Sequence, residues 1–271
     1  RGSDRGRPMR DLIDLRCGPY QTALADVEMV DAVIVDAPYS ARTHGGHDAG
    51  KKAPGYGRSP ASMVDPIKKP RPLTYDGWSV EDVQSFVDSW SPRCRGWMVA
   101  ITDHNLTPAW SAAMESHGRY VFAPLPWFAP GSRVRLSGDG PSSWTCWIVV
   151  GRPRTGTYRD GTAASKWGTL PGGYNVTTGC NAHQRGMRKA HIGGKPSKLM
   201  RMLVNDYSRP GDLICDPCAG WATTLLAAAQ EGRRAVGSEM DPETYADALK
   251  RLDRDTQQAD LFSDLRRQEG S

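Results

Sequence analysis

Four residues at the end of an apolar run could handle a planar amino group. Asp36, Ala37, Pro38 and Tyr39 follow the apolar residues 33–35, which are typical of a buried strand. Asp36 can accept hydrogen bonds from an exocyclic NH2, Pro38 stiffens the turn and leaves its carbonyl to accept another, and Tyr39 offers a ring face for stacking. An ordinary strand exit explains the four residues equally well, so a catalytic interpretation needs a second motif.

A second motif lies near the other end of the chain. Residues 210–224 indicate a turn, a short buried strand ending in Asp216, a small-residue loop around Gly220 and a helix start. Such a loop lets a ligand approach the backbone, and amides at a helix start can donate to a carboxylate. A second strand ends in Glu239, and an acid about 20 residues beyond such a loop commonly binds ribose hydroxyls. No lysine follows the glycines and Gly-x-Gly-x-x-Gly is absent, which excludes a P-loop and a nicotinamide site.

Together the two motifs resemble those of the S-adenosylmethionine-dependent DNA amino-methyltransferases. That family reads Asp-Pro-Pro-Tyr for adenine N6 and often Ser-Pro-Pro-Tyr for cytosine N4, so this chain departs at Ala37 and its leading Asp36 favours adenine. The catalytic motif precedes the cofactor motif, which is similar to the permuted β group. Two further departures are Ala222, where the family has a second loop glycine, and Trp221, where a small residue is usual.

The resemblance implies S-adenosylmethionine as the cofactor and transfer of its methyl group to adenine N6 in a flipped-out nucleotide. It implies catalytic roles for Asp36, Pro38 and Tyr39. Lys195 belongs to a Lys-Pro pair that, in the family, helps to enclose the methionine end of the cofactor. The expected cofactor-binding residues are Asp216, Cys218, Ala219, Gly220, Thr223, Thr224, Glu239, Met240, Asp241 and Lys195.

Basic residues are concentrated in two segments. Residues 40–72 carry seven Lys or Arg against two Asp, and residues 152–189 carry seven against one Asp, while the whole chain has a net charge of +5. This asymmetry favours double-stranded DNA as the partner, although two solvated loops would show the same pattern. We expect a DNA-contacting loop at about 40–75 and a target-recognition region at about 151–194. The expected DNA contacts are Arg42, His44, Lys51, Lys52, Arg58, Arg154, Lys166, Arg185 and Arg188.

Alternating strands and helices must position these motifs. Strands are expected near 10–16, 31–36, 96–102, 119–123, 143–150, 212–216 and 234–239, which predicts an α/β, Rossmann-like fold with a seven-stranded, mostly parallel sheet and helices on both faces. The resemblance places the strand that ends at Asp216 beside the strand that ends at Asp36. We expect one domain over 9–271, with a catalytic half (9–150), a cofactor-binding half (195–257) and a tail (258–271), preceded by a leader at 1–8.

Composition narrows the remaining questions. With 271 residues, 38% of them hydrophobic, the chain can bury one sizeable core, and no apolar run approaches the roughly 20 residues of a membrane span. We expect a cytoplasmic protein with reduced cysteines. No metal site is predicted, because neither His44 with His47 nor Cys215-x-x-Cys218 has a second ligand pair. The family resemblance suggests a homodimer, and the sequence does not indicate whether a restriction endonuclease accompanies it.

Other functions stay open at this point. The chain could be a cytosine-N4 methyltransferase, or a decayed relative that binds DNA as a regulator without transferring methyl groups. Methylation of RNA or of a protein glutamine is a third reading, for which Asn-Pro-Pro-Tyr would be commoner. Pro217-Cys218 also resembles the nucleophile site of cytosine-C5 enzymes, although its place directly after the cofactor-type strand disfavours that role.

Overall fold

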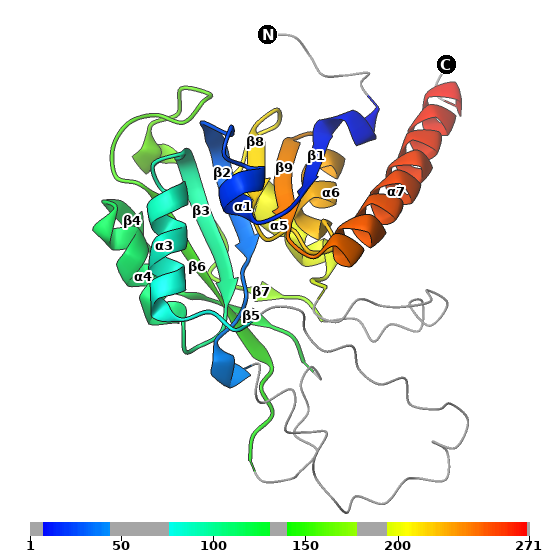
Figure 1. Ribbon diagram of the computed structural model, residues 1–271. Helices are drawn as coiled ribbons and strands as arrows, with labels where there is room; N and C mark the ends of the chain where they lie inside the picture. The colour runs from blue at the N-terminus through cyan, green and yellow to red at the C-terminus, as the bar shows by residue number, and fades with distance from the viewer. Residues whose placement is uncertain (1–7, 44–75, 131–139, 178–193, 270–271) are drawn as a thin grey trace, which may run out of the picture.

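The computed structural model describes residues 8–43, 76–130, 140–177 and 194–269 (Figure 1). Along the chain its elements are η1 (Met9–Leu12), β1 (Ile13–Cys17), α1 (Tyr20–Ala23), β2 (Val30–Asp36), α3 (Val80–Trp90), β3 (Cys94–Thr102), α4 (Thr107–Ser116), β4 (Arg119–Val121), β5 (Leu125–Phe128), β6 (Thr145–Pro153), η3 (Ala164–Lys166), β7 (Tyr174–Asn175), α5 (Ser197–Tyr207), β8 (Leu213–Asp216), α6 (Thr223–Gln230), β9 (Arg234–Glu239) and α7 (Pro242–Glu269).

One mixed sheet organises the described residues. Its strand order is β1-β9-β8-β2-β3-β6-β5-β7, with β4 paired to β6. The first five strands of that order are parallel, whereas β6 runs antiparallel to β3, β4 and β5. The predicted α/β class and mostly parallel sheet are confirmed. The predicted count of seven strands is two short of the nine described, because β5 contains a proline and β7 has only two residues.

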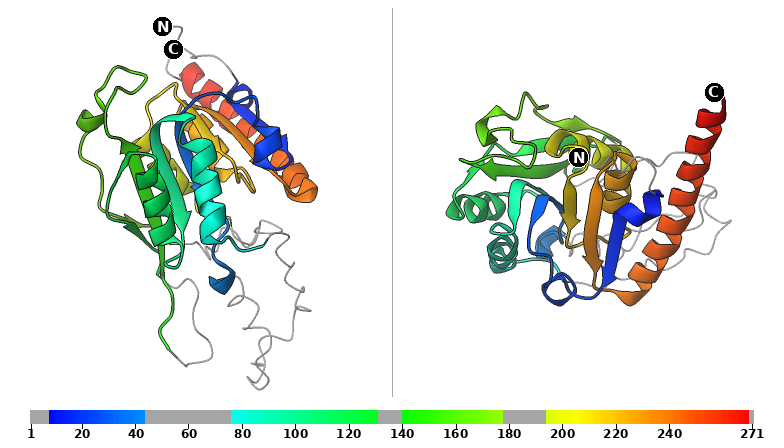
Figure 2. Two further views of the ribbon diagram at one scale, coloured as in Figure 1. Left: turned by 60° about the vertical axis from the view of Figure 1, so that its left-hand side comes forward. Right: turned by 90° about the horizontal axis from the view of Figure 1, so that it is seen from above.

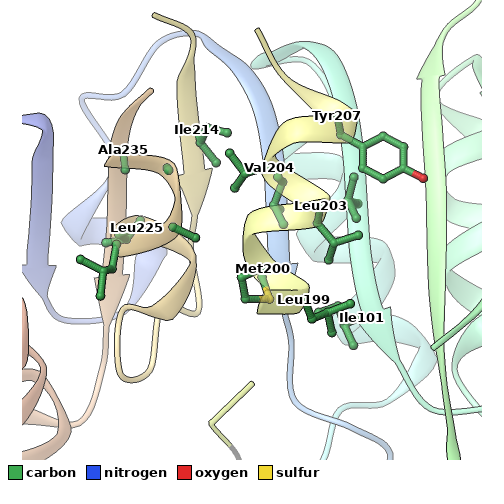
Figure 3. Close-up of a cluster of buried hydrophobic side chains, with 14 of the residues drawn as sticks. Ile101, Leu199, Met200, Leu203, Val204, Tyr207, Ile214, Leu225 and Ala235 are labelled. Atoms are coloured by element: carbon green, nitrogen blue, oxygen red, sulfur yellow. The ribbon is translucent and has the colours of Figure 1, made fainter. Parts of the chain in front are cut away.

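Hydrophobic clusters cover both faces of the sheet. Side chains of successive strand residues point to opposite faces, so Ile34 joins one cluster while Val33 and Val35 join the other. The first cluster includes the buried sides of α5 and α6, and Figure 3 shows part of it, with Leu203 of α5 and Leu225 of α6. The second cluster includes α3 and α4, which lie on the other side of the sheet in Figure 2. Helices therefore flank the sheet on both faces, as predicted.

The two strands that carry the sequence motifs are neighbours. β2 and β8 pair in parallel, with Ala32 opposite Ile214 and Val33 opposite Cys215. Their carboxyl ends therefore reach the same edge of the sheet, toward the lower end of Figure 1. On the other side of β8, a Cβ atom at Gly237 would lie 2.6 Å from the Asp216 carbonyl oxygen, so β9 can pack this closely only with glycine. The expectation that these strands lie side by side is confirmed.

Several helix boundaries follow from local sequence. Ser79 and Asp82 form a capping box at the start of α3, with each side chain bonded to the other residue's backbone amide. Pro196 precedes the first turn of α5. α7 continues through residues 258–269 of the expected tail at 258–271. Among the described residues, no helix has the length and apolar character needed to cross a bilayer.

Candidate active site

The carboxylate of Asp36 lies at the carboxyl end of β2, where it contacts Lys195. The Lys195 ammonium donates to Asp36 Oδ2 at 2.5 Å, and the two side chains are only 12% and 23% exposed. The same nitrogen lies 5.0 Å from the centre of the Tyr39 ring. Tyr39 is buried, and its hydroxyl donates to Cys146 Sγ at 3.7 Å. Together with half-buried Pro38, these residues place a carboxylate, a cation and an aromatic ring at one edge of the sheet.

Asp103 anchors the backbone that follows this motif. It comes directly after β3 and is 4% exposed. Its Oδ2 accepts bonds from the Ser40 amide at 3.0 Å, the Ser40 hydroxyl at 2.5 Å and the Thr43 hydroxyl. Its Oδ1 accepts from the amides of Asn105 and Leu106, each at 3.0 Å. Burial alone would raise the pKa of Asp103, but the bonds from Ser40 and Thr43 outweigh it and lower that pKa, so the anchor is a charged group.

Asp216 ends β8 as the most buried acid of the site, with 1% of its surface exposed. Its Oδ1 accepts a bond from the Cys218 amide at 3.1 Å. Burial raises the pKa of Asp216 to about 7, and the charges of Asp36 and Glu239 raise it further, while a bond from Thr224 opposes the rise. Three acids from β2, β8 and β9 therefore influence one another electrostatically. This edge of the sheet favours a positively charged ligand.

Glu239 ends β9 and is oriented by the backbone around it. The Asp241 amide donates to its Oε1 at 2.8 Å, and bonds from the Gly220 and Met240 amides also hold its carboxylate. Burial nevertheless raises the pKa of Glu239 above its usual range. Asp241 instead caps the start of α7, because its Oδ1 accepts a hydrogen bond from the Thr244 amide of the first turn at 2.7 Å. Met240 is 58% exposed beside these acids.

The small-residue loop between β8 and α6 is tied to its neighbours. The Ala219 amide donates to the Ser238 carbonyl of β9 at 2.9 Å. Gly220 has a φ of +51°, a left-handed conformation that glycine adopts without strain. Thr223 and Thr224 are buried in the first turn of α6. The predicted cofactor-binding residues of β8, this loop and β9 are thus close together in the fold.

The departures from the family pattern have structural explanations. Ala37 is 3% exposed and packs in the cluster on the α3 face. Ala222 has a φ of +57°, where glycine is favoured, which costs about 1–2 kcal/mol for a residue with a Cβ atom. Its fully buried methyl group offsets about 0.8 kcal/mol of that cost. Trp221 is held against α7, where Arg251 Nη1 donates to its carbonyl at 2.8 Å and the guanidinium lies 5.4 Å from its ring.

The residues predicted to bind DNA fall into three groups. Arg42 is exposed and lies shortly after the end of β2. Arg154 and Lys166 follow β6 in the chain. Because β6 runs antiparallel to β3, its end, which pairs with β4, lies at the opposite edge of the sheet from Asp36. The nine residues of β3 span about 30 Å, so Arg154, which directly follows β6, does not lie beside Asp36. The rest lie outside the described residues: His44, Lys51, Lys52, Arg58, Arg185 and Arg188.

Arg159, in the same segment, contacts acids at the opposite edge of the sheet from Asp36. Arg159 Nε donates to Asp212 Oδ1 at 2.8 Å and lies 3.4 Å from Asp31 Oδ2. Asp31 and Asp212 lie at the amino ends of β2 and β8, opposite the edge that carries Asp36 and Asp216. Arg159 therefore does not lie beside Asp36, and the target-recognition region expected at about 151–194 stays a prediction.

The cysteines show no sign of catalytic chemistry. The five described cysteines are free thiols, and Cys180 lies outside the described residues. Burial raises the pKa of the Cys218 thiol well above its usual range, with Asp216 and Glu239 adding to the rise, so the nucleophilic thiolate is disfavoured. No three His, Cys, Asp or Glu side chains are grouped as a metal site in the part of the chain that the structure describes.

Sequence reasoning missed two features of this site. It did not single out Asp103, although the signal was present, since an acid directly after a strand is the same pattern that identified Asp36 and Asp216. It assigned Lys195 to the cofactor alone, whereas the structure pairs Lys195 with Asp36, the candidate catalytic carboxylate. The second contact spans 159 residues and has no local signature.

A family model described as DNA methylase, of the N6/N4 type, matches residues 69–250. The chain belongs to this DNA methylase family. The matched residues include the cofactor-type motif and begin after Tyr39, so the match does not include Asp36.

Relatives of this DNA methylase are similar over part of their length. The type II methyltransferase M.Cfr9I of Citrobacter freundii is 26% identical over 140 residues, which are 52% of this chain and 47% of that protein. The DNA adenine methyltransferase YhdJ of Escherichia coli is 38% identical over 63 residues, which are 23% of this chain and 21% of that protein. The chain thus spans about half the length of M.Cfr9I and about a fifth of the length of YhdJ.

Solved structures share the fold over most of the chain. The complex of M1.HpyAVI with SAM has a TM-score of 0.60 and 17% identity, covering 89% of this chain and 98% of that one. The cytosine-N4-specific PvuII DNA methyltransferase has a TM-score of 0.58 and 15% identity, covering 88% and 87%. Likeness at this level of identity establishes the Rossmann-like methyltransferase architecture.

Proposed function

We propose that this protein transfers the methyl group of S-adenosylmethionine to an exocyclic amino nitrogen of a base in DNA, adenine N6 in particular. The observation that carries the proposal is the parallel pairing of β2 and β8, which brings Asp36 and Asp216 to one edge of the sheet. Ligands of open α/β sheets bind outside the carboxyl ends of the strands. Membership of the DNA methylase family supports the reaction class.

The residues at this edge fit the proposed cofactor. Glu239, held by three backbone amides, presents a fixed carboxylate to ribose hydroxyls. The acids Asp216 and Asp36 favour the positive charges of the sulfonium and the amino group. Gly220 allows a ligand to approach the backbone of the loop. When bound, S-adenosylmethionine supplies a methyl group on a cationic sulfur, which is already a good leaving group.

The residues of β2 would prepare the amino group for attack. The exocyclic nitrogen is conjugated with its ring, so it is a poor nucleophile until its hydrogens are held by acceptors. Asp36 and the Pro38 carbonyl supply those acceptors, and the Tyr39 ring holds the extruded base by stacking. When bound, the cofactor would supply the methyl group that this nitrogen takes up, and the surplus proton would pass to the Asp36 carboxylate, which already accepts a hydrogen bond from the amino group. Positioning supplies most of the rate enhancement.

Lys195 occupies groups that the incoming base would need. Its ammonium donates to Asp36 Oδ2 and lies over the Tyr39 ring, and an incoming amino group needs those same two groups. We infer that Lys195 keeps the Asp36 carboxylate oriented and moves aside, or shares that oxygen, when the base enters.

Adenine is favoured over cytosine because the motif begins with Asp36, and YhdJ is named as an adenine enzyme. The likeness to the cytosine-N4-specific PvuII enzyme keeps cytosine N4 as the second candidate. Double-stranded DNA is the proposed substrate and a homodimer is the proposed assembly. Exposed Arg42, beside the catalytic strand, supports the choice of DNA.

The test is transfer of labelled methyl groups to genomic DNA, followed by nucleoside analysis. We expect N6-methyladenine, and recovery of N4-methylcytosine instead would refute the adenine assignment. In Asp36→Asn, transfer should fall by at least about 100-fold with cofactor binding retained. The matched control is Asp26→Asn, at an acid whose side chain is 70% exposed, which should keep wild-type activity. A protein that binds DNA but neither binds the cofactor nor transfers methyl groups would be the decayed regulator.

A further inference from the structure

Two aromatic side chains are exposed where the paired strands β5 and β6 extend past the edge of the sheet that carries Asp36. Trp144 and Phe128 are each 40% exposed, and their ring centres lie 6.1 Å apart. β3 ends at Thr102, which lies opposite Trp147, whereas β6 begins two residues farther out (Figure 1). Adjacent exposed rings form an apolar patch, and such patches commonly contact a ligand or a partner.

The strand register places Trp144 relative to Asp36. Asp36 lies opposite Ile101 of β3, and Ile101 lies opposite Ile148 of β6. The Ala129 amide donates to the Trp144 carbonyl at 2.8 Å, so the pairing of β5 with β6 continues to Trp144. Four residues of strand span about 13 Å. Trp144 therefore stands about that far beyond the row of Asp36, on the side of the sheet edge where the substrate would approach.

Trp144 also shares a face of the sheet with the candidate catalytic residues. Cys146 packs against the hydrophobic cluster that contains α5, and its Sγ accepts from the Tyr39 hydroxyl at 3.7 Å. Alternate residues of a strand lie on one face, so Trp144 and Cys146 are neighbours on that face, about 7 Å apart. Trp144 is thus the next residue outward from the contact between Cys146 and Tyr39.

We propose that Trp144 stacks on the base pair that flanks the extruded nucleotide. The inference rests on the proposed function, in which a nucleotide leaves the duplex so that its amino group reaches Asp36. A nucleotide on that path passes from a duplex outside the sheet edge to the row of Asp36, and Trp144 stands beside the path. Extrusion costs the stacking between the target base and its neighbours, and an aromatic ring that stacks on a neighbour restores part of it.

This assignment makes Trp144 a positioning residue. Its ring contacts the duplex beside the target and touches neither the cofactor nor the reacting nitrogen. Phe128, on the adjacent strand, supports the Trp144 ring from one side. Stacking on a π face does not depend on the identity of the base, so Trp144 assists extrusion without reading the sequence.

Methyl-transfer kinetics test this role on a duplex that contains the sequence methylated in genomic DNA. Trp144→Leu removes the π face and should lower kcat/KM for the duplex about tenfold, with cofactor affinity unchanged. Trp144→Phe keeps a ring and should stay within about threefold of the wild type. Tyr120→Leu is the matched control and should keep wild-type kinetics, because it removes a ring that is 42% exposed from β4, which pairs with the far end of β6.

A second duplex separates stacking at the extruded nucleotide from a structural role. In this duplex the target base is mispaired, so that extrusion costs less. Extrusion then limits the rate less, and the loss in Trp144→Leu should shrink from about tenfold to about threefold or below. A defect in folding or in the shape of the site would instead lower transfer on both duplexes by the same factor.

Each outcome decides the inference. A loss in Trp144→Leu that the mispaired duplex relieves supports it. Four results overturn it: Trp144→Leu within about twofold of the wild type on the paired duplex, an equal loss in Tyr120→Leu, the same loss on both duplexes, or a loss in Trp144→Phe as large as in Trp144→Leu. A wild-type protein that transfers no methyl groups to DNA would refute the proposed function, and the inference with it, whereas the four results above leave the proposed function intact.

Discussion

Asp103 provides the sharpest test of how the candidate site is built. Asp103→Ala removes a buried carboxylate that accepts bonds from the backbone and hydroxyl of Ser40, from Thr43, and from the amides of Asn105 and Leu106. A hydrogen bond to a charged group contributes about 1.5–3 kcal/mol, and donors near the surface recover part of that from water. We therefore expect the free energy of unfolding to fall by about 3–5 kcal/mol. Asp103→Asn keeps one acceptor oxygen and should cost about half as much.

The effect on activity should exceed the effect on folding. Ser40 directly follows Tyr39, so release of this anchor lets the catalytic turn shift. A displacement of about 1 Å can reduce a rate about 100-fold. We expect kcat to fall by about that factor under conditions where the variant is folded, with cofactor affinity little changed because Asp103 makes none of the contacts around Glu239.

Denaturant unfolding, methyl transfer and cofactor titration on one preparation measure these quantities. The control is Asp88→Asn, which alters an exposed acid paired with His117 and should leave the unfolding midpoint unchanged. If Asp103→Ala unfolds within roughly 0.5 kcal/mol of the wild type and transfers methyl groups at a similar rate, Asp103 does not position the catalytic turn.

Three further predictions concern other buried charges. Because the folded-state pKa of Asp216 is raised from 3.8 to about 7, ionisation opposes folding, so the free energy of unfolding of the ligand-free protein should fall as pH rises between those values. Cofactor affinity should rise over the same range as the carboxylate becomes charged, and Asp216→Asn should flatten both profiles in denaturation and titration. Lys195→Gln should lower kcat by about 10–100-fold while cofactor affinity is kept, whereas loss of affinity with kcat retained would assign Lys195 to the cofactor. Arg119→Met should lower the free energy of unfolding, measured with denaturant, by about 3–5 kcal/mol. The reason is that this buried guanidinium donates to the carbonyls of Ser91, Cys94 and Gly96. A decrease below about 1 kcal/mol would contradict that role.

Many helix starts and strand ends were predictable because they depend on residues that are close together in the sequence. The Ser79 capping box, the proline before α5 and the acids that end three strands each depend on residues within a few positions of one another. Short or interrupted strands were the weak point, since β5 and β7 lack the length that gives a recognisable period. The left-handed backbone of Ala222 was foreseeable only as a departure from a glycine pattern.

By itself the sequence determined which chemical groups are available: a carboxylate and an aromatic ring after one strand, and acids flanking a small-residue loop after two others. Tertiary structure alone decided that Lys195 contacts Asp36, that Asp103 holds Ser40, and that Arg154 lies at the far edge of the sheet. The reason is physical. Side-chain periodicity specifies an element, but a contact such as that between Asp36 and Lys195, 159 positions apart, depends on strand order. That order is set by how all the elements bury their apolar faces together.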